Sequence, residues 1–426
     1  MRPKILSATS VVLFLMCLMY GITYIDRVNV TTAASEFKGA LHFNNTQVGF
    51  IFSAFAYPYL IFQIIGGWVS DKFGARRALT VSAIIWAAAT LAFGLANTLV
   101  MMVAARVLLG FGEGATFPCA TRAMSDWAPA SQRGFVQGIT HSAARLGNAV
   151  TPPLVAWLIA LTRFRWRGSF FILGIVSFIW AVVWWFYFRD NPADHPSITP
   201  EELATLPVFK KERHRDPVPW GPLIVRMFPV TLVYFCYGWT LWLYLSWIPP
   251  FFLHNYHLDL KKSALFSAGV FLAGVIGDTA GGVVSDWVFR RTGNLNTARR
   301  NLVVAGFLCS LGCMLPILYV HDLNIAAICL SAAFFFAEFT IGPMWAIPMD
   351  IAPRFSGSAS GLMNTGSAAA AIVSPVIAGY IVDKTGNWNL PLWGSIGLLL
   401  IGAAMAFLMK PGNGLPEIAQ GTQPAR

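Results

Sequence analysis

Apolar runs of about 20 residues recur along nearly the whole chain, and they restrict what it can fold into more than any other feature. A run of this length is what an α-helix needs to cross a hydrocarbon core roughly 30 Å thick. Only 12% of the residues are charged, against about 25% in an ordinary soluble domain. The chain is therefore predicted to be an all-α polytopic membrane protein. Its twelve predicted transmembrane helices cover residues 11–31, 47–69, 78–97, 99–121, 134–160, 168–188, 226–254, 263–285, 301–320, 323–347, 356–382 and 391–410.

The basic residues predict an orientation in the membrane. The net charge of +11 would also suit a nucleic-acid partner, but about two thirds of the lysines and arginines fall in segments on the same side of the membrane as the N-terminus. Cytoplasmic loops carry such an excess, so both termini are expected in the cytoplasm. We expect a protein of the bacterial inner membrane that is surrounded by lipid and has no nucleic-acid partner.

The chain repeats a short motif at about half its length. The stretch "GGWVSDKFGARR" lies between spans 2 and 3, and "GGVVSDWVFRRTG" lies between spans 8 and 9, so that Asp71 matches Asp286. The duplication predicts two six-helix bundles related by pseudo-symmetry. The predicted units are an N-terminal bundle at 1–188, a Pro-rich cytoplasmic linker at 189–222, a C-terminal bundle at 223–410 and a cytoplasmic tail at 411–426.

The first copy of this motif resembles the cytoplasmic loop signature of the major facilitator superfamily, and the twelve spans in two halves match that family's plan. The second copy departs from the signature, because Trp287 stands where a basic residue is expected. The glycine lets two helices approach closely, and Asp71 can pair with Arg76 or with a helix N-terminus in one conformation only. The residues predicted to form this gating loop are Gly67, Asp71, Arg76, Arg77 and Asp286.

Two further motifs resemble the anion:cation symporters, a branch of that superfamily that includes bacterial sugar-acid carriers and the animal sialic-acid and vesicular glutamate carriers. They are Tyr24-x-Asp26-Arg27 in the first span and the pair of Arg106 and Glu113 in the fourth. The resemblance implies a major facilitator fold, alternating access and transport of an organic carboxylate, driven by protons in the bacterial members. We expect the carrier to work as a monomer.

Arg27 is the first candidate for a substrate site. It shares a helix face with Tyr24, whereas Asp26 points about 100° away. An arginine can clamp a carboxylate with two hydrogen bonds while neighbouring phenols donate to it. The alternative interpretation is an arginine–carboxylate pair that only holds helices together.

Asp26, Glu113 and Arg106 are candidates for proton coupling. Arg106 and Glu113 fall on one face of the fourth span, about two turns apart. Burial favours a protonated carboxyl and a nearby arginine favours an ionised one, so movement of Arg106 would turn Glu113 from a proton acceptor into a donor. A permanent interhelical salt bridge is the alternative.

Arg145 is a third arginine within a predicted span, on the same helix face as His141. The N-terminal half then holds three arginines against two acids, and a substrate anion would balance the surplus, which favours a substrate with two carboxylates. A structural bond from Arg145 to backbone carbonyls near Pro152 is the alternative.

Other polar side chains within the spans are candidates for binding substrate hydroxyl groups, because each buried hydroxyl needs a partner. Helix packing is the alternative for each of them. With Tyr24, Arg27, His141 and Arg145, the predicted substrate-binding set includes Tyr59, Gln63, Tyr237 and Asn364. Asp278 and Glu338 are further acids within the spans, and we assign them no role.

These observations favour a secondary active transporter that imports an organic carboxylate, such as a sugar acid or a related hydroxy or dicarboxylic acid, by proton symport. An anion exchanger without proton coupling and a carrier of aromatic acids are the alternatives. No enzyme is expected, because the sequence has no HExxH, GxSxG or P-loop pattern. All six cysteines lie in predicted spans, where cysteine packs as a small hydrophobic side chain, so we expect no disulfide, metal site or cofactor.

Overall fold

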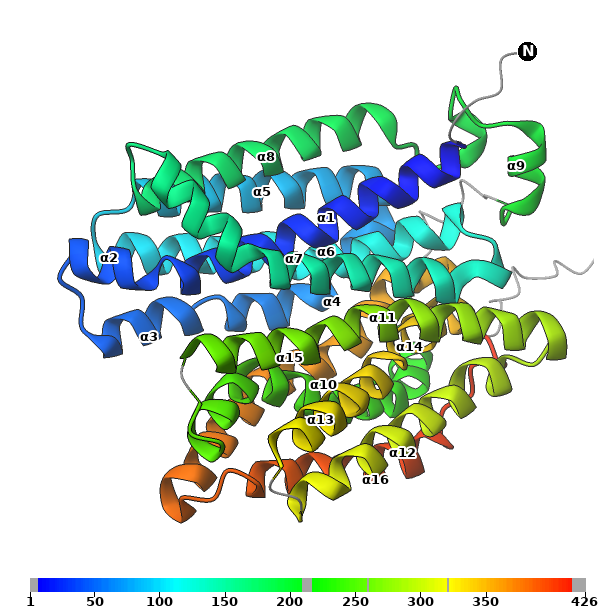
Figure 1. The fold of residues 1–426 in the computed structure, drawn as a ribbon. Helices are drawn as coiled ribbons and strands as arrows, with labels where there is room; N and C mark the ends of the chain where they lie inside the picture. Colours follow the sequence, from blue (N-terminus) through cyan, green and yellow to red (C-terminus); the bar gives the residue numbers. More distant parts are fainter. Residues whose placement is uncertain (1–6, 209–216, 259, 320–321, 416–426) are drawn as a thin grey trace, which may run out of the picture.

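The computed structural model describes residues 7–208, 217–258, 260–319 and 322–415, which form helices joined by short connections (Figure 1). Parts of the predicted linker and tail, residues 209–216 and 416–426, lie outside the described residues. The α-helices are α1 (Ala8–Thr32), α2 (Ala34–Ala40), α3 (Asn45–Ser53), α4 (Ala56–Phe73), α5 (Ala75–Leu95), α6 (Leu99–Trp127), α7 (Arg133–Leu161), α8 (Trp166–Tyr187), α9 (Pro200–Thr205), α10 (Trp220–Asn255), α11 (Leu260–Thr292), α12 (Leu302–Met314), α13 (Leu323–Glu338), α14 (Ile341–Ile351), α15 (Ser356–Thr385) and α16 (Leu390–Ala406).

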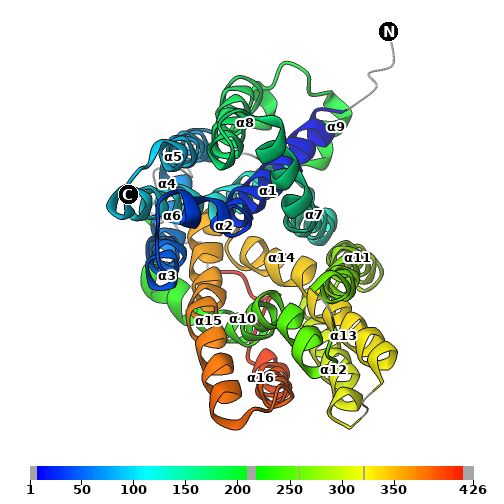
Figure 2. The same ribbon diagram turned by 60° about the vertical axis from the view of Figure 1, so that its left-hand side comes forward.

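The helices pack as two bundles, one built from α1–α8 and the other from α10–α16 (Figure 1). Figure 2 shows the boundary between them, where α7 lies beside α11 and α4 lies beside α15. Many large apolar side chains are exposed on the outside of the bundles, among them Phe14, Val100 and Val376. An apolar outer surface of this extent suits contact with lipid rather than with water.

The helices reproduce the predicted spans closely. Eleven helical segments of the described chain are long and apolar enough to cross a membrane, and the twelfth, α16, is shorter at 17 residues. The second span consists of α3 and α4, which are separated by a break at residues 54–55. The tenth consists of α13 and α14, and its break at Phe339 and Thr340 directly follows Glu338. Discontinuous helices commonly line the binding sites of transporters.

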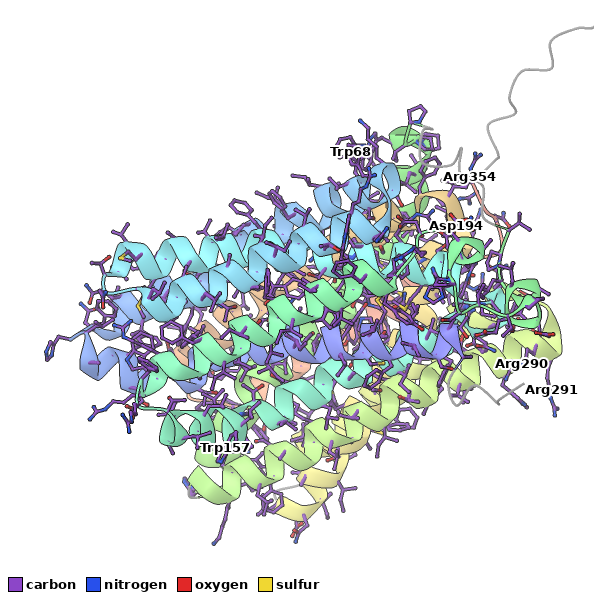
Figure 3. The ribbon with its side chains drawn as sticks, turned by 90° about the horizontal axis from the view of Figure 1, so that it is seen from above. Trp68, Trp157, Asp194, Arg290, Arg291 and Arg354 are labelled. Atoms are coloured by element: carbon purple, nitrogen blue, oxygen red, sulfur yellow. The ribbon has the colours of Figure 1, made fainter. Side chains whose placement is uncertain are left out.

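The bundles have two distinct ends. One end, called the linker end here, carries the start of α1, the α4–α5 turn and α9, and Figure 1 shows α9 beside the start of α1. Figure 3 shows Asp194, Arg290, Arg291 and Arg354 at this same end. The opposite end, with α2 and α3, is called the far end.

Local signals explain where several helices start and stop. Asn44 and Gln47 form a capping box at the start of α3, and Thr199 and Glu202 form another at the start of α9. Such boxes satisfy the free backbone N–H groups of a first helical turn. Gly74 separates α4 from α5 at a φ of 88°, a conformation that glycine adopts at little cost.

Candidate substrate and proton site

A small cavity lies between the two bundles, near the middle of the helices. Its volume is about 20 Å³, which is room for about one water molecule. Six of the predicted substrate-binding residues line it, and they are Tyr24, Arg27, Tyr59, His141, Arg145 and Asn364. The remaining lining residues are Phe117, Tyr234, Leu241, Trp242, Trp345, Ser367 and Ala368. The cavity is therefore built by both bundles and has aromatic walls around two arginines.

Arg27 is held in a cage of aromatic rings. Its Cζ lies 5.0 Å from the ring centroid of Tyr24, 4.6 Å from that of Tyr59 and 5.2 Å from that of Phe117. These are distances at which a guanidinium is attracted to a ring face. Its Nη2 is buried without a hydrogen-bond partner among the described residues. The cage fixes the guanidinium beside the cavity and leaves it a free donor.

Glu113 on α6 is the partner of Arg27 on α1. The Arg27 Nε donates to Glu113 Oε2 at 2.5 Å, and Glu113 is fully buried. The predicted pairing of Glu113 with Arg106 differs from this arrangement. Arg106 instead donates from Nε to the backbone oxygen of Ile51 at 3.3 Å. The physical reason is that Arg106 lies two turns along the same helix from Glu113, whereas Arg27 approaches across the helix interface.

Asp26 points away from the cavity toward α8, as its place on the helix predicts. Its Oδ2 accepts a hydrogen bond from Ser177 at 3.1 Å, and its Oδ1 is buried without a partner in the described structure. A buried carboxyl with only one donor is costly to keep ionised. Asp26 is therefore a buried acid with one hydrogen-bond donor, one residue from the arginine that faces the cavity.

Arg145 joins the two bundles through a network of hydrogen bonds. Its Nε and Nη2 donate to Glu338 Oε2 at 3.1 and 2.9 Å, and its Nη1 donates to the hydroxyl of Tyr24 at 3.0 Å. Tyr237 receives a bond from Arg145 and donates its own hydroxyl to Glu338 Oε1 at 2.9 Å. Asp278 is the second acid here, 3.9 Å from Arg145 Nε. The sequence left open a structural role in which Arg145 bonds to backbone carbonyls near Pro152. The observed hydrogen bonds of Arg145 go to other partners.

The buried charges change the balance that the sequence suggests. Near the cavity, the N-terminal bundle alone supplies three arginines against two acids. Glu338 and Asp278 reach Arg145 from the other bundle, and both are fully buried. Around the cavity, the described charged residues are therefore three arginines and four carboxyls, so the surplus of positive charge disappears once the bundles meet.

The other predicted binding residues take mixed positions. Gln63 does not line the cavity, but its Oε1 accepts from Asn364 Nδ2 at 2.9 Å, which links α4 to α15. His141 Nδ1 lies 2.8 Å from the Gln137 carbonyl, and its ring packs 4.8 Å from that of Trp345. Its Nε2 is buried without a partner in the described structure. Tyr237 lies behind the cavity, against Glu338.

The gating-loop aspartates close the linker end in a symmetrical way. Asp71 accepts bonds from the backbone N–H groups of Gly357 and Ser358, at 3.0 and 2.7 Å, in the first turn of α15. Asp286 accepts from Gly134 and Phe135, at 3.0 and 2.6 Å, in the first turn of α7. Each carboxylate thus binds the positive end of a helix in the opposite bundle. This is the helix N-terminus pairing that the sequence allowed.

The remaining loop residues take different positions, with Arg76 bound within the N-terminal bundle and Gly67 at the boundary between the bundles. Arg76 donates from Nε to the Trp185 carbonyl at 2.9 Å rather than to Asp71, and Arg77 is exposed. Gly67 lies against the backbone of Gly357, where an added Cβ would overlap the carbonyl group. A close approach of two helices therefore needs glycine at this position.

Three buried arginines at the linker end are absent from the predicted set. Arg122 lies 3.5 Å from Asp71 and 2.9 Å from Asp126, and Arg299 lies 2.9 Å from Asp286. Arg133 binds Asp350 across the bundle boundary, and Arg299 binds the same carboxylate within the C-terminal bundle. The i, i+4 spacing of Arg122 and Asp126 was the available signal. The basic cluster after Asp71 points to Arg76 and Arg77 instead.

Two six-helix bundles with ionisable residues at the midplane of their interface are the architecture of a secondary transporter. The family model of the Major Facilitator Superfamily matches residues 16–375. The chain belongs to the major facilitator superfamily, and it is an integral membrane transporter rather than an enzyme. The predicted family and fold are thereby confirmed.

The chain is similar to carriers of organic acids along nearly its whole length. It is 45% identical to a probable sulfoacetate transporter of Cupriavidus necator, over 94% of this chain and 93% of that protein. It is 31% identical to a hexuronate transporter of Bacillus subtilis, over 89% of each chain. It is 29% identical to a probable galactarate/D-glucarate transporter of Escherichia coli, over 94% of this chain and 93% of that protein.

Solved structures share the fold at low sequence identity. The fucose:proton symporter of E. coli gives a TM-score of 0.73 at 13% identity, with 95% of this chain and 99% of that chain covered. The proton:xylose symporter bound to 6-bromo-6-deoxy-D-glucose gives 0.74 at 16% identity, with 96% and 97% covered. At this identity the likeness concerns the fold alone.

Proposed function

We propose that this protein imports an organic acid of the sulfoacetate and sugar-acid kind by proton symport. The observation that carries the proposal is the pair of Arg27 and Glu113 at the cavity. Arg27 is a caged guanidinium with a free donor, and its one anionic partner is a buried acid of the same bundle. A substrate carboxylate or sulfonate takes the place of Glu113 at Arg27, with Tyr24 and Tyr59 beside it.

Charge balance links this exchange to protons. The cavity already has more carboxyls than arginines, so an added anion leaves buried negative charge without a partner. Unpaired buried charge is strongly unfavourable, and protonation of a displaced carboxyl removes it. In this scheme Glu113 takes up a proton as it leaves Arg27, with Asp26 and Arg106 as its partners in proton handling.

The transport cycle follows from the contacts between the bundles. In the described chain, the hydrogen bonds that join the bundles lie between the cavity and the linker end, and Arg145 and Asn364 make the outermost of them. The excess of basic residues at the linker end favours a cytoplasmic location for it. The structure then corresponds to a carrier closed toward the cytoplasm, and release of the substrate requires the bonds of Asp71 and Asp286 to open. We propose a monomeric carrier in a bacterial inner membrane with both termini inside.

The test is uptake by the purified carrier in proteoliposomes. Radiolabelled sulfoacetate, galacturonate and glucarate are offered with an imposed pH gradient, inside alkaline. Proton symport predicts accumulation of at least one of them above the external concentration, and collapse of that accumulation when a protonophore removes the gradient. Uptake that needs a counter-anion inside the vesicles and ignores the gradient would establish exchange instead.

A further inference from the structure

We propose that Arg145 is a second anion-binding point, and that Glu338 and Asp278 form the carboxyl pair that takes up a proton when an anionic group of the substrate replaces Glu338. The substrate is then a short acid with two anionic heads, and each head brings one proton. This inference rests on the proposed function and extends it to a second site, which is built mainly by the C-terminal bundle.

The guanidinium of Arg145 already holds an anion in the way that a substrate site would. Two of its nitrogens converge on one oxygen of Glu338, and the hydroxyl of Tyr237 donates to the other oxygen at 2.9 Å. Guanidinium and phenol donors together suit a carboxylate or a sulfonate. Arg145 also lines the cavity, whereas Glu338 does not. Glu338 therefore binds Arg145 from the side that faces away from the cavity. An anion in the cavity competes with Glu338 for Arg145.

Asp278 is a second carboxyl beside the single guanidinium of Arg145, so this cluster holds more acids than arginines. Asp278 is fully buried, and neither of its oxygens has a hydrogen-bond partner among the described residues. Arg145 Nε lies 3.9 Å from Asp278 Oδ2, and the carboxyl of Glu338 also lies beside Asp278. One arginine cannot neutralise two buried carboxylates, so one of the pair carries a proton. The pair stores a proton before substrate arrives.

The proton balance of the exchange is simple. Before substrate binds, Arg145 carries one positive charge, ionised Glu338 carries one negative charge and protonated Asp278 carries none. The cluster is therefore neutral. When the anionic head binds Arg145, the charge of the head replaces that of Glu338, and one O–H bond forms as Glu338 takes up a proton. In the described part of the chain, the other titratable groups facing the cluster are Tyr237 and Tyr234 on α10, Tyr24 on α1 and His141 on α7. The phenols stay protonated near neutral pH.

The separation of the two arginines fits a short acid. The Cζ of Arg27 lies 5.0 Å and that of Arg145 lies 5.7 Å from the ring centroid of Tyr24. The two Cζ atoms are therefore at most the sum of these distances apart, about 11 Å. Each guanidinium carbon stands about 4 Å from the centre of a bound anion, since charge-assisted N–H···O bonds are roughly 2.8 Å long. An acid with heads separated by two or three bonds is long enough to reach both arginines, and the cavity of about 20 Å³ has to widen to admit it.

The same exchange changes how the bundles are joined. Arg145 belongs to α7, and Glu338 is the last residue of α13, directly before the break that leads into α14. Replacing the carboxylate of Glu338 by a substrate head frees the end of α13 from the other bundle. A two-headed substrate then bridges α1 and α7 in its own right, so binding and the release of an interbundle bond occur together.

Calorimetry and pH-dependent binding test the inference on the full-length carrier in lipid nanodiscs. Sulfoacetate is the two-headed probe, and acetate and methanesulfonate are its single-headed halves. In the wild type, the dissociation constant for sulfoacetate should rise up to about a hundredfold per pH unit, since two protons are linked to binding. In the Glu338→Gln/Asp278→Asn variant the rise should fall to about tenfold per unit, since the second proton site is gone. An exposed acid of α15 provides the control, and Asp383→Asn should keep the wild-type slope.

Arg145→Gln separates anion binding from structural support. It should weaken sulfoacetate at least tenfold while acetate binding stays within about twofold, since acetate needs Arg27 alone. If the acid-pair variant does not fold, the Arg145→Gln/Glu338→Gln variant replaces the ion pair by two amides, and it should show the same reduced slope. A wild-type slope in these variants, or an equal loss of sulfoacetate and acetate in Arg145→Gln, would overturn the inference and make the cluster a structural bridge. A wild type that binds sulfoacetate with no pH dependence would overturn proton symport as well.

Discussion

Asp71 and Asp286 make the same contact on opposite sides of the pseudo-twofold axis. Each carboxylate accepts two backbone N–H groups from the first turn of a helix in the other bundle, α15 for Asp71 and α7 for Asp286. Each also has a buried arginine at its side, Arg122 and Arg299 respectively. The sequence repeat is thus a structural repeat of one latch, used twice to close the linker end.

The latch predicts that Asp71→Asn and Asp286→Asn shift the carrier toward the conformation open at the linker end. Hydrogen bonds to charged groups contribute about 1.5–3 kcal/mol each, so each variant should lower the ratio of closed to open molecules by tenfold or more. Spin labels on the exposed positions Arg77 and Trp287 would report the change as a longer distance in pulsed EPR. An unchanged distance distribution in both variants would show that these carboxylates do not hold the closed state.

Arg27→Lys should strongly weaken substrate binding in a carrier that still folds. An ammonium keeps the charge, but it lacks the planar fork that binds an anion with two hydrogen bonds and stacks on the rings of Tyr24 and Tyr59. We expect at least a tenfold weaker affinity for sulfoacetate, measured by ligand-induced thermal stabilisation. Arg167→Lys, at the far end of α8, is the matched control and should bind as the wild type does. Full affinity in Arg27→Lys would remove Arg27 from the site.

Glu113→Gln should weaken the coupling of transport to the pH gradient. Glutamine resembles the protonated acid, so substrate still binds Arg27 and still exchanges against the same substrate across the membrane. Net accumulation driven by a pH gradient should fall, because the proton linked to Glu113 is lost and only the proton linked to Glu338 and Asp278 remains. Counterflow and gradient-driven uptake are measured on the same vesicles. A variant that accumulates substrate as the wild type does would make Glu113 structural.

The linker helix α9 predicts a pH effect outside the membrane. Partial burial of Glu202 would raise its pKa, but hydrogen bonds from Thr9 and Thr199 outweigh this and hold the pKa of its carboxyl below the ordinary 4.5. Because the docked state has the lower pKa, the stabilisation is fully present above pH 4.5 and is lost as the pH falls through the docked value. The protection factors of the α9 amides, which are exchange rates corrected for the intrinsic effect of pH, should therefore fall at low pH in the wild type. Glu202→Gln should show reduced protection of α9 already at neutral pH.

Most of the fold could be predicted from the sequence, because helices in lipid leave a simple signal. Backbone groups must be satisfied within each span, so length and apolarity mark the helices, and the repeated motif indicates two bundles. The breaks within the second and tenth spans could not be read in this way. They leave the segments apolar throughout, and the break after Glu338 carries no proline or glycine at its two turn residues.

The sequence predicts which residues form the candidate site better than it predicts which of them pair with one another. Periodicity places Arg27, Glu113 and Arg145 on inward faces, but it does not say which helix stands opposite. Arg27 therefore took the place predicted for Arg106 as the partner of Glu113. Glu338 was visible as a costly buried acid, yet its partner lies 193 residues away in the other bundle, a relationship that only the packed structure supplies.

The closed seam at the linker end is largely backbone against backbone. Gly67 lies on Gly357, and Gly134 lies on Gly282, with no side chain between them. Apolar burial contributes about 25 cal/mol per Å², and a glycine contact buries little apolar surface. When this seam parts, it exposes peptide groups that water hydrates readily, so solvent itself assists the opening. The stability of the closed state then depends on a few hydrogen bonds to carboxylates, and it is easily adjusted. A seam of apolar side chains would instead resist hydration each time the carrier opened.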